Sequence, residues 1–205
     1  MQRVSRSQRF GIVLSAPLDE GGERAILSTM KRLFVSLILL AGLVVVVKAV
    51  SKQRTNGKLN IGDPLPAATA EDQDGKLVQL SVAGNSGYTL VYFYPKAMTP
   101  GCTAQACSLR DAYSELQNNG VKIFGVSLDT VDSQKKFQEK EHLPFVLLSD
   151  RQKKVTSAFG VPLILNSLAA RQAYLFKDGK LVWMDAHAST GKQASDLLEV
   201  LAQQP

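Results

Sequence analysis

The feature that most constrains the fold is the alternation of short apolar segments with helix-like segments across residues 61–205. Two of the apolar segments, Thr89–Tyr94 and Val121–Leu128, are rich in β-branched and aromatic residues, which is typical of buried central strands. The apolar residues of the segment between them fall at helical spacing, from Leu109 through Ala112 and Tyr113 to Leu116. The pattern therefore predicts an α/β domain.

The predicted order of elements starts with two short strands around the turn Asp72–Gly75, near 67–71 and 76–80. After the strand at 89–94 we expect a helix near 100–118, a strand at 121–128, a helix near 131–141, a strand at 145–148, a helix at 152–159, a hairpin of 173–176 and 181–184, and a helix near 191–203. This is the order of a thioredoxin-like α/β fold, with a central mixed sheet flanked by helices. Function in such folds lies at the carboxyl ends of the strands.

An apolar run of fifteen residues, 33–47, precedes this domain. Lys31 and Arg32 stand before the run and Lys48 follows it. A helix that spans a bilayer needs about 20 apolar residues, whereas a secretory signal needs a basic start and about 7–15 apolar residues. The run is therefore predicted to be a cleaved signal peptide or an N-terminal membrane anchor.

The chain is accordingly predicted to have four parts. They are an N-terminal extension with a basic region (1–32), the signal peptide or anchor (33–50), a polar linker (51–60) and the thioredoxin-like domain (61–205). Met30, directly before the basic pair, is an alternative start. Both interpretations of the apolar segment place the domain outside the inner membrane, so we expect a periplasmic location.

Charge and composition exclude several function classes. Residues 1–59 contain ten Lys and Arg against three Asp and Glu, a net charge of +7, whereas residues 60–205 contain fourteen against fifteen, a net charge of −1. The domain has no basic surplus for phosphates, which argues against nucleic-acid binding. Two cysteines and two histidines leave little for a disulfide scaffold or a metal centre.

Cys102 lies where a helix start favours a reactive thiol. Thr99 is a typical N-cap residue and Pro100 a typical first helical residue, so Cys102 is the third residue of the predicted helix. Free backbone N–H groups and the positive end of the helix dipole favour a thiolate there. Cys102 also lies seven residues before Leu109, which puts it on the core-facing side of the helix. A sheltered thiolate is suited to peroxide chemistry.

Cys107 is five residues further along the same predicted helix. That spacing separates the two Cα atoms by about 8–9 Å, whereas a disulfide needs about 4.4–6.8 Å. If the two cysteines form a bond, the first turn of the helix must therefore unwind.

The residues around both cysteines resemble a known family. Pro95-x-x-x-Thr99-x-x-Cys102 matches the active-site motif of the peroxiredoxins, and the run from Phe93 to Thr103 with a second cysteine at position 107 is similar to the bacterioferritin comigratory protein / peroxiredoxin Q family. The similarity extends over residues 60–205 and includes Gly62-Asp63-x-x-Pro66, the Asp72–Gly75 turn, Leu148-Ser149-Asp150 and Phe159-Gly160-Val161.

The resemblance implies a role for five residues. Cys102 corresponds to the peroxidatic cysteine and Cys107 to the resolving cysteine. Thr99 corresponds to the hydroxyl that hydrogen-bonds the peroxide and the thiolate, and Pro95 to the residue that shields the thiol. Arg171 corresponds to the guanidinium that stabilises the thiolate and polarises the peroxide, for which its permanent charge and rigid fork are suited.

The implied function is that of a thiol peroxidase that reduces hydrogen peroxide and organic hydroperoxides. A thioredoxin-like dithiol protein would recycle it, no metal, haem or flavin cofactor is implied, and we expect a monomer. Gln105 is a departure, because many relatives carry Glu there. The residues do not identify the reductant or the preferred peroxide.

Three other functions are compatible with such a fold. An exported thioredoxin-like thiol-disulfide oxidoreductase needs Cys-x-x-Cys, whereas this chain has four residues between its cysteines. A copper-delivery module needs Cys-x-x-x-Cys and a distant His. A membrane-tethered scaffold without chemistry leaves Thr99, Cys102 and Arg171 unexplained. Titration with hydrogen peroxide, in which the loss of free thiols is monitored, separates these three functions from the peroxidase.

Overall fold

In a computed structural model of the chain, the structure describes residues 58–203. The predicted segments 1–32 and 33–50, and residues 51–57 of the linker, lie outside the described residues. From Lys58 to Gln203, no helix is both long enough and apolar enough to cross a bilayer. Leu59, which we expected in the linker, is buried in the core, so the ordered domain starts at or before this residue.

A mixed sheet of seven strands forms the centre of the domain, with the order β2-β1-β5-β4-β3-β8-β9. The strands are β1 (Thr69–Asp72), β2 (Leu77–Gln79), β3 (Tyr88–Phe93), β4 (Val121–Ser127), β5 (Val146–Ser149), β8 (Gln172–Lys177) and β9 (Lys180–Asp185). The central strands β3, β4 and β5 are parallel, and antiparallel strands extend the sheet on both sides. The predicted mixed sheet is confirmed.

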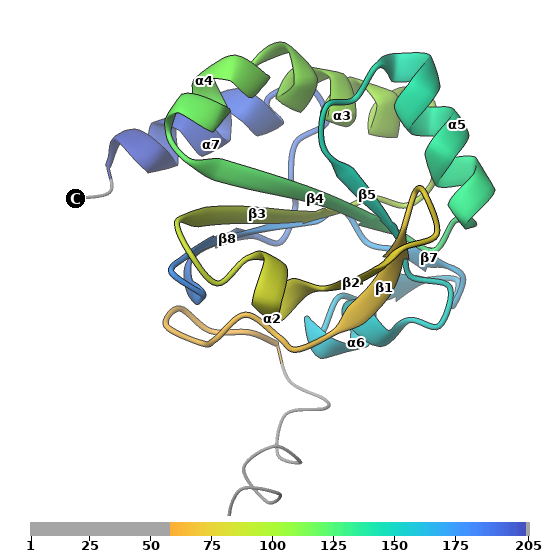
Figure 1. The fold of residues 1–205 in the computed structure, drawn as a ribbon, viewed down its shortest axis with the longest axis horizontal. Coiled ribbons are helices and arrows are strands. Elements are labelled where there is room, and N and C mark those ends of the chain that lie inside the picture. The colour runs from red at the N-terminus through yellow and green to blue at the C-terminus, as the bar shows by residue number, and fades with distance from the viewer. Residues whose placement is uncertain (1–57, 204–205) are drawn as a thin grey trace, which may run out of the picture. The chain divides into compact units, whose positions relative to one another are not determined.

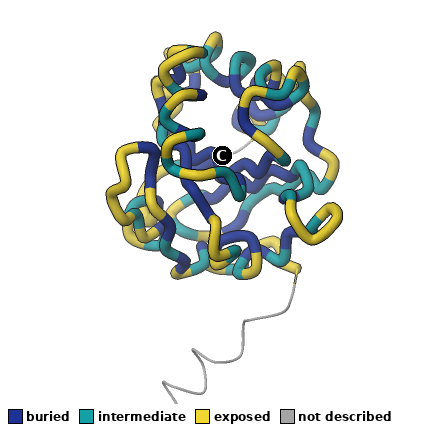
Figure 2. Tube along the Cα trace, turned by 90° about the vertical axis from the view of Figure 1, so that its right-hand side faces the viewer, coloured by how far each residue is buried: buried dark blue, intermediate teal, exposed yellow. Residues whose placement is uncertain are grey.

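Helices cover both faces of this sheet (Figure 1). They are α2 (Leu80–Ala83), α3 (Pro100–Asp111), α4 (Tyr113–Asn118), α5 (Val131–Glu141), α6 (Lys154–Ala158) and α7 (Gln193–Ala202). Figure 1 shows α3, α4, α5 and α7 on one face and α2 and α6 on the other. Along β3, alternate side chains enter the two cores: Leu90 and Tyr92 face the larger helical layer, and Val91 and Phe93 face the smaller one. Both sets are fully buried, and Figure 2 shows the strands as the buried centre.

The predicted helix at 100–118 is wrong in one respect, because the chain forms two helices with a break at Ala112. Ala112 has φ −94° and ψ 7°, and its N–H points to the carbonyls of Ser108 and Arg110. Leu109 before the break and Leu116 after it are both fully buried, so the break keeps the apolar side on the core. Neither Gly nor Pro occurs at this point, which is why the spacing alone predicted one continuous helix.

Two small elements were not predicted. The short helix α2 follows β2 directly, and a second sheet pairs β6 (Leu163–Ile164) with β7 (Leu168–Ala169). Each strand of that second sheet has only two residues, too few to show an alternating pattern.

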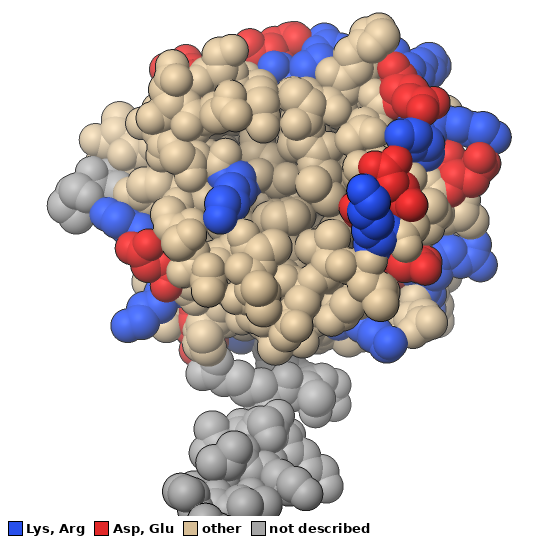
Figure 3. Space-filling model, in the orientation of Figure 1, with Lys and Arg blue, Asp and Glu red and all other residues tan. Residues whose placement is uncertain are grey.

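Charged side chains of both signs are mixed on the side of the domain that carries α5, at the right of Figure 3. Ion pairs join Lys135 to Asp74 at 2.8 Å and Lys136 to Asp132 at 2.8 Å. These side chains are well exposed, so each pair contributes little to stability.

Candidate active site

Cys102 lies at the carboxyl edge of the parallel strands, as the sequence predicted. Strand β3 ends at Phe93, a short loop follows, and α3 begins at Pro100, so Cys102 is the third helical residue. Its side chain is only 2% exposed and packs in the same cluster as Leu109. The thiol is therefore sheltered within the core-facing side of the helix.

The loop before α3 is fixed by Asp129, which lies two residues after the end of β4. The backbone N–H of Ala97 donates to Asp129 Oδ2 at 2.8 Å, and the Ser127 hydroxyl donates to the same oxygen at 2.7 Å. Met98 adopts the left-handed conformation with φ 61°, which turns the chain into the helix. The end of β4 thus determines where α3 starts.

Arg171 lies just before β8, the strand that pairs with β3, and its side chain reaches Cys102. Its Nη2 lies 3.3 Å from Cys102 Sγ, and its Nη1 donates to Gln105 Oε1. A Cβ added at Gly101 would lie 3.5 Å from Nη2, so the guanidinium packs against the helix backbone. A permanently positive group beside the sulfur stabilises a thiolate and can polarise a bound oxygen.

Gln105, noted in the sequence only as a departure, is fully buried beside this arginine. Its Oε1 accepts from Arg171, and its Nε2 donates to Gln193 Oε1 at 2.9 Å. Gln193 is the first residue of α7 and is also fully buried. A continuous line of hydrogen bonds therefore runs from α7 to the thiol.

Thr99 and Pro95 lie in the loop that leads to Cys102, but their side chains are not joined to the thiol. Thr99 is the N-cap residue of α3, yet its hydroxyl donates to the carbonyl of Lys96 at 2.9 Å and makes no capping bond to the helix. Pro95 is partly buried and lies two residues after the end of β3. Both residues border the site that the motif predicts.

Cys107 occupies a different environment from Cys102. Both thiols are free and lie in the continuous helix α3. The Cys107 thiol donates to Glu141 Oε2 at 3.7 Å, and Arg110 Nη1 donates to the Glu141 carbonyl at 2.8 Å. Burial raises the pKa of the Cys107 thiol; the charge of Glu141 raises this pKa further, whereas Arg110 lowers it.

This raised pKa gives the helix a pH dependence with a definite sign. A thiol whose pKa is higher in the folded than in the unfolded chain stabilises the folded state below its ordinary pKa, and that stability is lost as pH rises through the folded value. Helix α3 should therefore open more readily at alkaline pH.

Substitution of Glu141 by Gln should lower the pKa of Cys107. The amide still accepts the thiol hydrogen bond but no longer opposes the thiolate charge. The measurement is the pH dependence of Cys107 alkylation in a Cys102→Ser background, and its midpoint should move to lower pH. The matched control is Glu139→Gln, an exposed glutamate on the same helix that pairs with Lys135. An unchanged or higher midpoint in Glu141→Gln would contradict the assigned cause.

Three residues that contact the site were not found from the sequence: Asp129, Glu141 and Gln193. Only Gln193 carried a recognisable signal, because it occupies a polar position four residues before Leu197 on the buried side of α7. Asp129 and Glu141 lie in polar segments, where nothing in the sequence distinguishes them from solvated residues.

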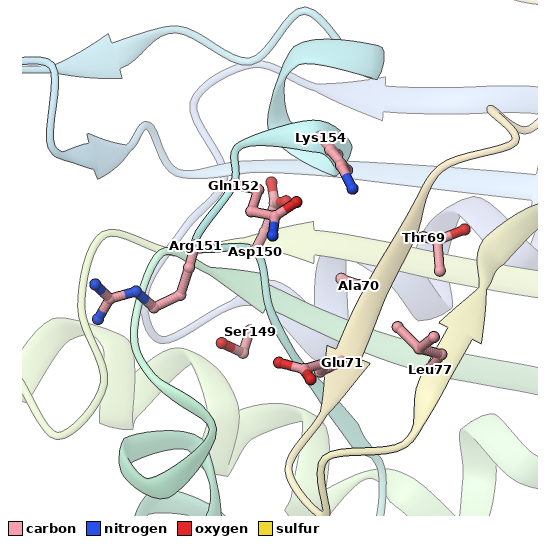
Figure 4. A pocket seen from close by; sticks show the side chains of 9 residues that line it. All are labelled: Thr69, Ala70, Glu71, Leu77, Ser149, Asp150, Arg151, Gln152 and Lys154. Atoms are coloured by element: carbon pink, nitrogen blue, oxygen red, sulfur yellow. The ribbon is translucent and has the colours of Figure 1, made fainter.

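A separate pocket of about 290 Å³ lies between β1, β2, the end of β5 and the start of α6. Its lining residues are Thr69, Ala70, Glu71, Leu77, Ser149, Asp150, Arg151, Gln152 and Lys154. Figure 4 shows Arg151 pointing away from the other lining side chains. Asp150 accepts hydrogen bonds from the backbone N–H groups of Val155 and Thr156, so its carboxylate serves to start α6. The pocket includes neither cysteine nor Arg171.

Residues 61–184 match the sequence model of the AhpC/TSA family, which is well over half of the chain. The chain belongs to the AhpC/TSA family. Among curated proteins, it is 42% identical over 127 residues to peroxiredoxin Q, chloroplastic, of Oryza sativa subsp. japonica, a match that covers 62% of this chain and 58% of the relative. It is 50% identical over 103 residues to peroxiredoxin Bcp of Escherichia coli K12, covering 50% of this chain and 65% of the relative. The chain thus spans little more than half the length of the curated relatives it matches.

Solved structures of similar proteins confirm the thioredoxin-like fold. Peroxidoxin BcpB of Mycobacterium tuberculosis is 33% identical, with a TM-score of 0.66, and the match covers 72% of this chain and 99% of that one. The bacterioferritin comigratory protein of Xanthomonas campestris is 26% identical, with a TM-score of 0.62 and coverage of 68% and 98%. The resemblance to the bacterioferritin comigratory protein / peroxiredoxin Q family is confirmed.

The predicted periplasmic location is wrong. The relatives whose names state a compartment are chloroplast proteins of plants. The prediction rested on residues 33–47, which lie outside the described residues. An apolar run with a basic flank indicates a segment that leaves water for an apolar phase, and this property does not specify a compartment.

Proposed function

We propose that the protein is a thiol peroxidase in which Cys102 is the nucleophile. The Cys102 thiolate attacks one peroxide oxygen, an S–O bond forms as the O–O bond breaks, and the second oxygen leaves as water or an alcohol after it takes up a proton. Arg171 stabilises the thiolate and the charge that develops on the leaving oxygen. The observation that carries the proposal is the 3.3 Å contact between Arg171 Nη2 and the buried Cys102 sulfur, two residues 69 positions apart in the chain.

Thr99 and Pro95 complete the proposed site. The Thr99 hydroxyl, which now bonds Lys96, exchanges this exposed partner for the peroxide oxygen and the thiolate. Pro95 shields the thiol from bulk water.

Cys107 is proposed to resolve the sulfenic acid. Its thiolate attacks the sulfur of the Cys102 sulfenic acid, an S–S bond forms as the S–O bond breaks, and the hydroxide that leaves takes up a proton to become water. Because both residues lie in one continuous helix, the start of α3 must open before the sulfurs can meet. The 3.7 Å contact with Glu141 holds Cys107 in its reduced position until then.

The substrates proposed are hydrogen peroxide and organic hydroperoxides. The Xanthomonas campestris relative is described in terms of its alkyl peroxide reduction activity, which supports the second class. A dithiol protein of the thioredoxin type is proposed to reduce the disulfide, since a dithiol can return two electrons in one encounter.

Titration of the reduced protein with hydrogen peroxide tests the proposal. The chemistry consumes one peroxide and two thiols per chain, and the product is an intramolecular disulfide visible by mass. Loss of peroxide without thiol loss, or thiol loss without consumption of peroxide, would refute it.

Replacing Cys107 by Ser separates the two steps. This variant should consume a single equivalent of peroxide per chain, gain one oxygen atom in mass and then stop, because no thiol remains to resolve the sulfenic acid. An added small thiol should restore turnover. Sustained turnover of the variant with a dithiol protein alone, at the wild-type rate, would show that Cys107 has no part in the reaction.

A further inference from the structure

A buried polar side chain on α7 has no role in the chemistry above, yet it ends the line of hydrogen bonds at the thiol. Gln193 Oε1 accepts from Gln105 Nε2 at 2.9 Å, Gln105 Oε1 accepts from Arg171, and Arg171 lies against Cys102. We propose that Gln193 is a positioning residue, which orients the Gln105 amide so that its oxygen faces Arg171. The inference deepens the proposed peroxidase function and rests on it.

The direction of each hydrogen bond follows from the donors involved. A guanidinium has only N–H donors, so Gln105 must turn its oxygen towards Arg171. The NH₂ end of the same amide then points the other way, into the core, where it needs an acceptor. Gln193 supplies that acceptor with its own oxygen.

The amide of Gln105 makes this partner necessary. A carboxylate has two equivalent oxygens, so it presents an acceptor to Arg171 in either orientation, whereas an amide presents one only when it is turned the right way. Without an acceptor at position 193, the NH₂ group of Gln105 would be buried and unpaired, which is unfavourable. The amide would then turn or shift, and Arg171 would lose the partner that holds it beside the sulfur.

The surroundings of Gln193 argue against a role in packing alone. Its neighbours Ala194, Leu197 and Leu201 are apolar and belong to the same buried cluster as Cys102. The Gln193 Nε2 atom is buried and has no hydrogen-bond partner among the described residues. An apolar side chain at this position would bring no unpaired donor of its own, but it would leave the NH₂ group of Gln105 without its acceptor. The need for an acceptor opposite Gln105 explains why position 193 carries an amide side chain.

The test replaces Gln193 by Met, which has similar length and no strong acceptor, in a Cys107→Ser background. Two rates are measured at fixed pH: oxidation of Cys102 by hydrogen peroxide, and alkylation of Cys102 by iodoacetamide. Both should fall about tenfold, the scale on which groups behind a reactive centre act. Gln193→Glu keeps an acceptor oxygen in either protonation state and should retain both rates to within about twofold of the parent.

Two controls separate positioning from a general loss of structure. Leu197→Ala removes a fully buried side chain from the same helix. It should lower the unfolding temperature more than Gln193→Met does, yet leave both rates nearly unchanged. In a Gln105→Leu background, Gln193→Met should cause no further loss, since Gln193 acts through Gln105.

The outcomes decide the inference in each case. Unchanged rates in Gln193→Met, an equal fall in Leu197→Ala, or a fall that persists in the Gln105→Leu background would overturn it. If the parent protein fails to react with peroxide, the proposed peroxidase function is wrong, whereas the alkylation series still decides whether Gln193 positions the arginine.

Discussion

Replacing Cys102 by Ser should abolish peroxide turnover. A hydroxyl at this position cannot take over from a thiolate, because its proton is far more firmly held, and the loss of a catalytic nucleophile costs several orders of magnitude in rate. The measurement is peroxide consumption by the reduced variant with a dithiol reductant in excess. Turnover should not rise above that of the reductant alone.

The matched control is Cys107→Ser, the same change five residues further along the same helix. It should keep the first reaction, with one peroxide consumed per chain, whereas Cys102→Ser should lose it. Activity of the Cys102→Ser variant above a trace would show that the nucleophile has been assigned to the wrong residue.

Replacing Arg171 by Met should slow the attack on peroxide about 10²- to 10³-fold, the range seen when one donor to a developing negative charge is removed. Met fills a similar volume but offers neither the charge nor the N–H donors that now lie against Cys102 and Gln105. The measurement is the rate at which Cys102 forms the sulfenic acid under single-turnover conditions. Arg171→Lys should recover only part of the loss, since a point charge cannot serve both partners at once.

Arg151→Met provides the control for charge. Arg151 is exposed after β5 and lines the pocket away from the cysteines. Removal of this positive charge should leave the rate unchanged. If Arg171→Met reacts with peroxide as fast as the parent, another group must stabilise the thiolate.

Elements with strong local signals were predicted close to their observed bounds. The helix at 131–141 has the bounds of α5, because the Thr130 hydroxyl accepts from the backbone N–H of Ser133 and fixes its start. The strands β3 and β4 followed from β-branched and aromatic residues that are buried on both faces of the sheet. The break at Ala112 and the two-residue strands β6 and β7 depend on tertiary packing, for which periodicity provides no signal.

The site was only partly predictable for a related reason. The place of Cys102 followed from helix-start residues next to it, whereas Arg171 could be assigned only through the family resemblance, since no local pattern connects residues 69 positions apart. Gln193 comes from the last helix of the domain, 88 positions from Gln105. Contacts of this kind depend on the fold, and the sequence around each residue does not reveal them.

The break at Ala112 limits how many helical residues have to unfold in each cycle of the proposed reaction. Because α3 and α4 are separate helices, α3 can melt as a unit of its own while α4 keeps its place through buried Leu116 and the contact of Tyr113 with Phe145. If residues 100–118 formed one continuous helix, unfolding of the first turn would destabilise the whole segment, because helix formation is cooperative. The local unfolding that brings the two sulfurs together can therefore end at Ala112, so that Tyr113 and Leu116 keep α4 packed on the sheet.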